Sequence, residues 1–299
     1  MRLVYTENVQ AITLPPGHRF PIGKYDRIFD ALRADFPRAM QLGAPATFDD
    51  VLAVHDRAYV EAVRDGTLSV AAVRRLGFPW SAALVQRSLR SVGGTLAALT
   101  WALAHGAAGH IAGGTHHAFR DRGEGFCVFN DIAVAIAIAR RDLDVKRCAV
   151  VDLDVHQGNG TAAIFRGDPE VLTVSLHGAR NYPFRKETSS LDVELDDGTR
   201  DQAYLDAVDE ALAEVERFRP DVVFFQSGVD VLEGDRLGRM ALSLRGVEAR
   251  NHAVYAMTKR LRVPLVVTLG GGYHREIERS IEAHVGVYRG LVRAFATAQ

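Results

Sequence analysis

Short runs of apolar, often β-branched residues alternate with longer stretches of helical periodicity, and this alternation constrains the fold more than any other feature. Runs that are apolar almost throughout, such as Val222 to Ser227, are typical of parallel strands covered on both faces. The alternation therefore predicts an α/β fold with a single doubly wound, mainly parallel sheet flanked by helices. We expect strands at residues 109–112, 148–154, 170–176, 222–227 and 263–269, and helices at 131–141, 202–218, 246–261 and 276–295.

The length of 299 residues suits one large sheet with its helices. No internal repeat, low-complexity tract or linker interrupts the chain, so we expect one domain over residues 1–299. The long polar loop from His177 to Ser190 is expected to line a site. The Gly93-Gly94 pair inside a helical stretch indicates close packing of that helix.

Charge and cysteine usage exclude several classes of partner. The formal net charge is -1, so no global field favours nucleic acid, an anionic membrane or a polycation such as a histone. No signal peptide is recognisable, and no apolar run approaches the roughly 18–20 residues that span a bilayer. The two cysteines, Cys127 and Cys148, form no CxxC pair and no disulfide framework. These features predict a cytoplasmic protein with no nucleic-acid or membrane partner, and they leave its oligomeric state open.

Carboxylates and a histidine stand at the end of the strand expected at 148–154. The two-residue period of a strand places Asp152 and Asp154, and by extension His156, on one face. Burial of two carboxylates beside an apolar strand is unfavourable unless cations or hydrogen-bond donors neutralise them. The simpler interpretation is a helix N-cap with a polar turn, but one carboxylate would suffice for capping.

Asp230 follows the strand expected at 222–227 and, taken alone, would more often be a turn residue. Parallel strands present their carboxyl ends at one edge of the sheet, so Asp230 can join Asp154 and His156. Three protein ligands with an open fourth position are typical of a catalytic metal site. Mixed oxygen and nitrogen ligands suit Zn²⁺ and also Fe²⁺.

Two further strand ends carry residues suited to hydrolysis. His116 and His117 follow a glycine pair after residues 109–112, and adjacent histidines near a metal-bound water could act as general base and general acid. Tyr273 follows the glycines after residues 263–269, and its hydroxyl could donate to an oxyanion. A surface histidine pair and a core tyrosine are the ordinary interpretations of each feature alone. Their joint occurrence at strand ends favours a catalytic site.

The motifs around these residues resemble those of the histone deacetylase family, which also includes acetylpolyamine amidohydrolases and acetoin-utilisation proteins. The resemblance spans nearly the whole chain. It is most specific in GGTHHAFRDRGEGFCVFND from Gly113, DLDVHQGNG from Asp152, SGVDVLEGDRLG from Ser227 and LGGGY from Leu269. The segments HQGNG and VLEGDRLG are most similar to the class IV branch. The resemblance implies the arginase-deacetylase fold.

The resemblance also implies a role for each matching residue. The metal ligands would be Asp154, His156 and Asp230, and the residues acting in catalysis would be His116, His117, Tyr273, Asp152 and Asn159. A structural potassium site would use Asp152, Asp154, His156, Ser175 and Leu176. The acyl-lysine channel would be lined by Gly125, Phe126, Tyr182, Leu237, Gly271 and Gly272.

Asn159 is a departure from the commoner family pattern, because most relatives carry an aspartate that supports the second histidine. The class IV branch shares this asparagine, so the departure does not imply inactivity. An amide oxygen can accept the ring N–H of His117 but carries no charge. His117 should therefore stay neutral to lower pH than in relatives with aspartate.

Two rival functions are open to this set of residues. A binuclear hydrolase of the arginase type needs further carboxylates two residues past His156 and Asp230, where this chain has Gly158 and Leu232. A catalytically weak module could instead keep the pocket only to bind acyl amines, although every polar group needed for turnover is present.

The sequence thus predicts metal-dependent hydrolysis of the amide of N-acyl-lysine or a related N-acyl amine. The expected cofactor is Zn²⁺, or alternatively Fe²⁺, with a structural K⁺ besides. The expected partner is an acylated lysine peptide or a small acylated amine. The apolar channel and the class IV resemblance predict an acyl range broader than acetyl alone.

Overall fold

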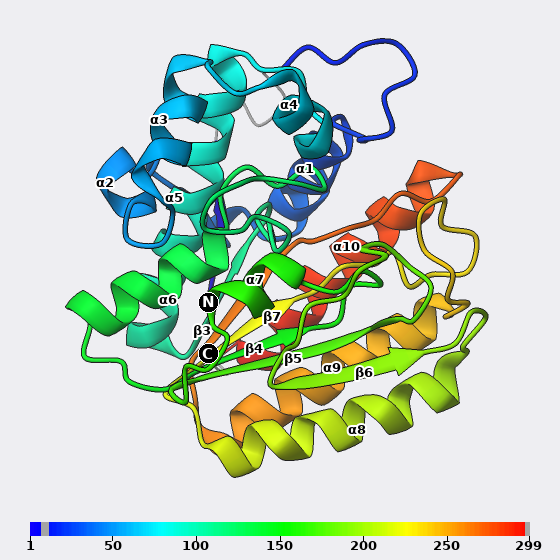
Figure 1. The fold of residues 1–299 in the computed structure, drawn as a ribbon. Helices are drawn as coiled ribbons and strands as arrows, with labels where there is room; N and C mark the ends of the chain where they lie inside the picture. Colours follow the sequence, from blue (N-terminus) through cyan, green and yellow to red (C-terminus); the bar gives the residue numbers. More distant parts are fainter. Residues whose placement is uncertain (7–11, 297–299) are drawn as a thin grey trace.

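A computed structural model describes residues 1–6 and 12–296 of the chain (Figure 1). Its centre is one eight-stranded sheet in the order β2-β1-β3-β8-β7-β4-β5-β6. Every neighbouring pair of strands is parallel, which confirms the predicted α/β architecture. The strands are β1 (Arg2–Tyr5), β2 (Met40–Leu42), β3 (Ala107–His110), β4 (Cys148–Asp152), β5 (Val171–Gly178), β6 (Leu191–Leu195), β7 (Val222–Gln226) and β8 (Leu265–Thr268).

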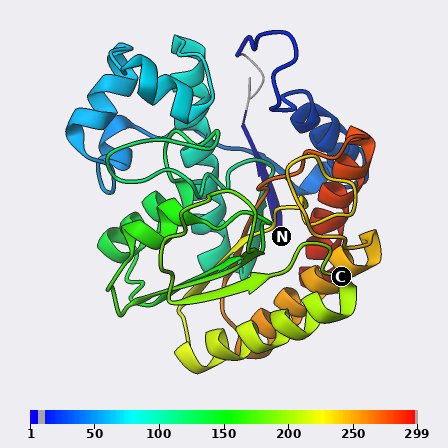
Figure 2. The ribbon, with the colours of Figure 1, turned by 45° about the vertical axis from the view of Figure 1, so that its right-hand side comes forward.

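Helices cover both faces of this sheet (Figure 2). On one face α1, α10, α9 and α8 pack side by side in that order, and on the other α5 lies against α6, β1, β3 and β8. This covering explains why every residue of β4 and β7 is buried. The helices are α1 (Lys24–Asp35), α2 (Phe48–Val51), α3 (Arg57–Asp65), α4 (Val70–Leu76), α5 (Ala82–His105), α6 (Asp131–Asp142), α7 (Asn159–Ile164), α8 (Asp201–Phe218), α9 (Leu244–Leu261) and α10 (Ile277–Phe295), with a short 3₁₀ turn at Pro37–Ala39. None of the helices in the described ranges is long and apolar enough to cross a membrane.

The predicted strands and helices are present, but their ends differ in ways that affect the site. The strand expected at 148–154 ends at Asp152, so strand alternation does not place Asp154 and His156. Instead the Asp152 carboxylate accepts the backbone N–H of Asp154, and the Asp154 carboxylate accepts that of His156. Such short side-chain bonds compete with ladder pairing and turn the chain away from the sheet. The short strands β1, β2 and β6 were not among the predicted strands, and β2 and β6 carry no strong apolar run.

The glycine pair in α5 makes the close contacts that the sequence indicates. A Cβ atom on Gly93 would lie 2.0 Å from the carbonyl oxygen of Ala44, and one on Gly94 would lie 2.1 Å from Nε2 of His110. The neighbours are therefore a loop and a strand of the sheet. A side chain at Gly93 would collide with the loop, and one at Gly94 would collide with β3 of the sheet.

Candidate active site

The candidate site lies at the carboxyl edge of the sheet, where the loops after β3, β8, β7 and β4 meet. These strands are neighbours in that order, so segments far apart in sequence converge there. The loop after β3 is held by Asp131 at the start of α6, whose carboxylate accepts the backbone N–H groups of Gly114 and Thr115 at 3.0 and 2.7 Å. This anchoring fixes the backbone just before His116.

Asp154, His156 and Asp230 form the compact group that the sequence predicts as metal ligands. One candidate ligand atom from each lies within 4.8 Å of the other two, and all three residues are buried. Nδ1 of His156 lies 3.0 Å from an Asp154 oxygen and 3.1 Å from an Asp230 oxygen. Two carboxylates and an imidazole converging on one point are a donor set suited to a divalent cation.

The electrostatics of this group also fit a cation. Burial, with the neighbouring Asp154 charge, raises the pKa of Asp230 to about 7. Burial opposes charge on His156 too, yet its hydrogen bonds to Asp154 and Asp230 raise its pKa to about 10. The cluster thus attracts positive charge strongly enough to overcome desolvation, as expected of a site that holds a metal ion.

Glycines allow the backbone to close around the carboxylates. The backbone N–H of Gly271 donates to Asp154 at 2.7 Å. A Cβ atom on Gly271 would lie 2.0 Å from an Asp230 oxygen, and one on Gly228 would lie 2.1 Å from an Asp154 oxygen. Larger residues at these positions would displace the ligands themselves.

The two histidines of the predicted pair have opposite electrostatic environments. Nδ1 of His116 donates to Asp152 at 2.6 Å, and although burial opposes the charge, Asp152 raises the pKa of His116 to about 9. Nδ1 of His117 donates to the amide oxygen of Asn159 at 2.7 Å. Burial and the nearby His116 and His156 lower the pKa of His117 well below its usual range. Near neutral pH, His116 therefore favours the charged form and His117 the neutral form.

Glu124 is a member of the site that the sequence reasoning missed. Its Oε1 accepts the Asn159 amide N–H at 2.7 Å and the Tyr182 hydroxyl at 2.9 Å. A carboxylate thus lies directly behind the asparagine that supports His117. Glu124 lies inside the motif GGTHHAFRDRGEGFCVFND, but nothing in the sequence indicates that its carboxylate contacts Asn159.

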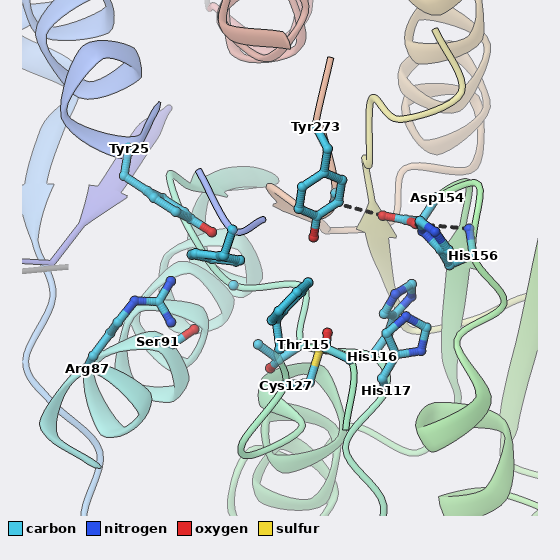
Figure 3. Close-up of a pocket in the computed structure, with 17 residues that line it drawn as sticks. Tyr25, Arg87, Ser91, Thr115, His116, His117, Cys127, Asp154, His156 and Tyr273 are labelled. Atoms are coloured by element: carbon cyan, nitrogen blue, oxygen red, sulfur yellow. Dashed lines mark hydrogen bonds and ion pairs between the residues drawn. The ribbon is translucent and has the colours of Figure 1, made fainter. Parts of the chain in front are cut away.

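Tyr273 points its hydroxyl between the histidines and a second group of residues, Tyr25, Arg87 and Ser91 (Figure 3). Its backbone N–H donates to the Asp235 carboxylate at 2.7 Å. Burial, with the nearby carboxylates, raises the pKa of Tyr273 well above its usual range, so the phenol stays protonated and can donate.

Burial lowers the pKa of Lys24 to about 8, and its ammonium donates to the carbonyl of Gly272 at 3.2 Å. Lys24, from α1, was not predicted and fixes the backbone before Tyr273.

Two connected spaces open onto these residues. The inner cavity, about 50 Å³, lies between His116, His117, Asp154, His156 and Tyr273 on one side and Tyr25, Arg87 and Ser91 on the other (Figure 3). Its far wall was not foreseen from the sequence.

The outer cavity, about 520 Å³, leads from the surface to His117, His156 and Tyr273. Of the predicted channel residues, Gly125, Phe126, Tyr182 and Leu237 line it, and the loop expected at 177–190 contributes Arg180, Asn181, Tyr182 and Phe184. Gly271 lines the inner cavity instead, and Gly272 lines neither, because its carbonyl faces Lys24.

Phe126, in the wall of the outer cavity, has φ 67°, a left-handed conformation that is strained for an aromatic residue. Such strain is concentrated at functional sites, where surrounding contacts enforce it. The neighbouring Gly125 also has a positive φ, and a Cβ atom there would lie 2.5 Å from Cδ2 of His117. The glycine thus lets the wall of the outer cavity approach His117.

The residues predicted to bind potassium lie together beside the metal group. Asp152 and Ser175 are directly paired on β4 and β5, and His156 follows in the loop after β4. The Ser175 hydroxyl is 3.0 Å from Nδ1 of His177.

A second metal centre has no matching ligands in the described part of the chain. That part of the chain contains one group of side chains that could hold a metal ion, namely Asp154, His156 and Asp230. Position 158 is a glycine whose added Cβ would lie 2.3 Å from an Asp152 oxygen, and Leu232 is buried in the core. The binuclear alternative is therefore disfavoured by the packing as well as by the sequence.

Comparison with known proteins agrees with this geometry. Residues 18–288 match the family described as "Histone deacetylase domain". An uncharacterised protein of Picosynechococcus sp. is 40% identical over 280 residues, covering 92% of this chain and 93% of its own length. Histone deacetylase 2 of Arabidopsis thaliana is 33% identical over 280 residues, covering 88% of this chain and 72% of its own length.

The crystal structure of acetylpolyamine aminohydrolase from Burkholderia pseudomallei superposes with a TM-score of 0.81 at 24% identity, covering 98% of this chain and 99% of that one. This likeness confirms the predicted arginase-deacetylase fold. The family match over residues 18–288 shows that the chain belongs to the histone deacetylase family.

Proposed function

We propose that the protein is a metal-dependent deacylase that hydrolyses the amide of N-acyl-lysine or a related N-acyl amine. The observation that carries the proposal is the convergence of Asp154, His156 and Asp230 beside a cavity that His117 and Tyr273 also line. There His117 favours its neutral form and Tyr273 its protonated form. Family membership supports amide hydrolysis as the reaction class.

Zn²⁺ is the proposed ion, with Fe²⁺ as the alternative, held by Asp154, His156 and Asp230. When bound, it would polarise the scissile carbonyl and lower the pKa of a water molecule. The protein groups around it then have separate tasks. His117, whose neutral form is favoured by burial and by the charge on His116, takes the proton of the attacking water through Nε2. Asn159 accepts from Nδ1 and so fixes the tautomer that leaves Nε2 free.

The tetrahedral oxyanion is stabilised by donors that are in place beforehand. The Tyr273 hydroxyl donates to it, and the positive charge that Asp152 maintains on His116 adds to the field. Protonated histidine then supplies the proton that releases the amine. Phe126 and Tyr182, whose rings line the outer cavity, would contact the aliphatic stem of lysine.

The resemblance of the motifs supports a potassium site and the class IV branch, while the absence of linkers and of a disulfide framework in the sequence supports one domain and a cytoplasmic location. Asp152, Asp154, His156, Ser175 and Leu176 would hold a structural K⁺. The chain would form a single deacetylase domain of the class IV branch, and it would act in the cytoplasm.

Metal content and turnover measured on the same sample test the proposal against a binding module. We expect about one divalent ion per chain and hydrolysis of a fluorogenic acetyl-lysine peptide, abolished by chelation and restored by Zn²⁺ or Fe²⁺. Binding of the peptide without hydrolysis, in protein loaded with either metal, would favour the binding module.

A further inference from the structure

The mouth of the outer cavity is ringed by arginine side chains. Six of the residues that line this cavity are arginines, and none of the described lining residues is acidic; the six are Arg19, Arg74, Arg75, Arg180, Arg236 and Arg239. We call these six residues the arginine rim. All six are exposed at the surface.

The arginine rim is assembled from separate parts of the chain. Arg19 precedes α1, Arg74 and Arg75 form the last turn of α4, and Arg180 follows β5. Arg236 and Arg239 lie in the loop between β7 and α9. Six positive charges gathered around one opening repel one another and destabilise the folded state. Their clustering is therefore better explained by a role in binding than by a role in stability.

Neighbouring carboxylates neutralise little of this charge. Asp197 lies 3.2 Å from Arg239 and 3.9 Å from Arg180. Within residues 1–6 and 12–296, Arg19, Arg74, Arg75 and Arg236 form no ion pair. Because the whole chain has a formal net charge of -1, the positive potential is local to the mouth.

We propose that the substrate is an acyl-lysine in an acidic peptide segment, with aspartate or glutamate residues flanking the modified lysine. This proposal rests on the deacylase function proposed above and names its substrate class. The acylated lysine is itself neutral, so the charge preference of the mouth acts on the flanking residues. Guanidinium groups pair with carboxylates through two parallel hydrogen bonds, and arginines placed around the opening can meet side chains on both sides of the lysine.

The same rim disfavours cationic carriers. A polyamine or a lysine-rich histone tail would bring like charges against the arginines. Phe184, 86% exposed, stands at the opening with its ring centroid 6.3 Å from that of Tyr182. It offers an apolar contact for a peptide between the charged flanks.

Three acetyl-lysine peptides of equal length, with acidic, neutral or basic flanks, test the proposal. We expect kcat/KM for the acidic peptide to exceed that for the neutral peptide by about tenfold at low salt, as a small number of exposed ion pairs would give. The basic peptide should be the poorest substrate. The differences should largely vanish at about 0.5 M NaCl, because salt screens exposed charges.

Substitution of the rim isolates its contribution. In the variant Arg19→Gln/Arg74→Gln/Arg75→Gln/Arg236→Gln, the acidic-to-neutral ratio should fall close to one. The control variant Arg219→Gln/Arg262→Gln removes exposed arginines that precede β7 and β8, at the opposite edge of the sheet, and should keep the ratio. Equal kcat/KM for acidic and neutral peptides in the wild-type protein would overturn the proposal.

Binding measured by fluorescence anisotropy separates this proposal from the deacylase function. Labelled, unacetylated acidic and neutral peptides report on the rim even if no peptide is hydrolysed. If acidic peptides bind preferentially without turnover, the rim assignment stands and the deacylase function fails. Stronger competition by a single-stranded oligonucleotide than by an acidic peptide of equal charge would overturn the peptide assignment in favour of nucleic acid.

Discussion

Replacement of Asn159 by aspartate probes the electrostatics of the base directly. The amide oxygen of Asn159 lies 2.7 Å from Nδ1 of His117, so Asn159→Asp places a carboxylate against that ring. Two unit charges about 4 Å apart at an effective dielectric constant of about 20 attract by about 4 kcal/mol, which corresponds to a change of about 3 in pKa. Taken alone, this would raise the pKa of His117 strongly.

Glu124 reduces that effect. Its carboxylate now accepts from the Asn159 amide nitrogen at 2.7 Å, so the new aspartate would face an existing carboxylate at hydrogen-bond distance. Two buried carboxylates this close share a proton near neutral pH. With one proton shared, the pair of carboxylates carries about the same total charge as Glu124 does alone, but part of that charge now lies next to His117. We therefore expect the pKa of His117 to rise by about 1.

The sign follows from the role of His117 as a base. Its folded-state pKa lies well below the usual value, so the neutral form persists as the pH falls. Raising the pKa moves the acidic limb of the kcat/KM profile to higher pH, and a rise of about 1 should make the variant about tenfold slower on that limb. The assay is a pH–rate series on both proteins, with metal occupancy measured at each pH.

A matched variant tests the role given to Glu124. In Asn159→Asp/Glu124→Gln the charge resides on residue 159 alone, so the limb should move further upward than in the single variant. Glu124→Gln by itself should move the limb downward or leave it in place. An acidic limb that is the same in all three variants as in the wild type would show that His117 is not the titrating base.

Asp154→Ala or Asp230→Ala should abolish metal binding and activity together, and a variant that retains one ion per chain would remove that residue from the site. Tyr273→Phe should lower kcat on the order of a hundredfold, because the hydroxyl acts mainly in the transition state; a change confined to KM would assign it to substrate binding. The small inner cavity, with Arg87 and Ser91 in its wall, leads us to expect kcat/KM to fall from acetyl to octanoyl peptides, against the broad acyl range that the motifs suggested. A gain of about 0.8 kcal/mol per methylene would instead show that the cavity opens to hold long chains.

The sequence predicted the core of the fold and the grouping of the candidate metal ligands because both depend on local patterns. Apolar runs such as β4 and β7 are visible as runs, and residues that follow parallel strands must meet at one edge. That rule is enough to bring Asp154 and Asp230 together. The prediction that the strand continues to Asp154 was wrong. The chain turns after Asp152 through hydrogen bonds from side chains to the backbone, which the periodicity of the sequence does not reveal.

The unpredicted parts of the site depend on contacts between distant segments. Lys24 reaches Gly272 from the first helix, and Glu124 reaches Asn159 from another loop. The arginine rim is similar, because single exposed arginines are ordinary until a fold gathers them around one opening. Composition reports the net charge of the chain but not the charge of a cavity.

The place of β8 in the sheet has a consequence for how the protein is made. β8 is the last strand in the chain, yet it lies between β3 and β7 and is the one strand that joins the three strands on one side to the four on the other. A nascent chain that ends before Leu265 would hold two partial sheets, each with an unpaired edge facing the other. Tyr273 lies shortly after the end of β8 at Thr268, so the sheet is completed and the proposed oxyanion donor is made in the same stretch of synthesis. Completion of the sheet and assembly of the candidate site therefore both depend on the final part of the chain, and truncations there should yield aggregation-prone fragments rather than a weakened but folded protein.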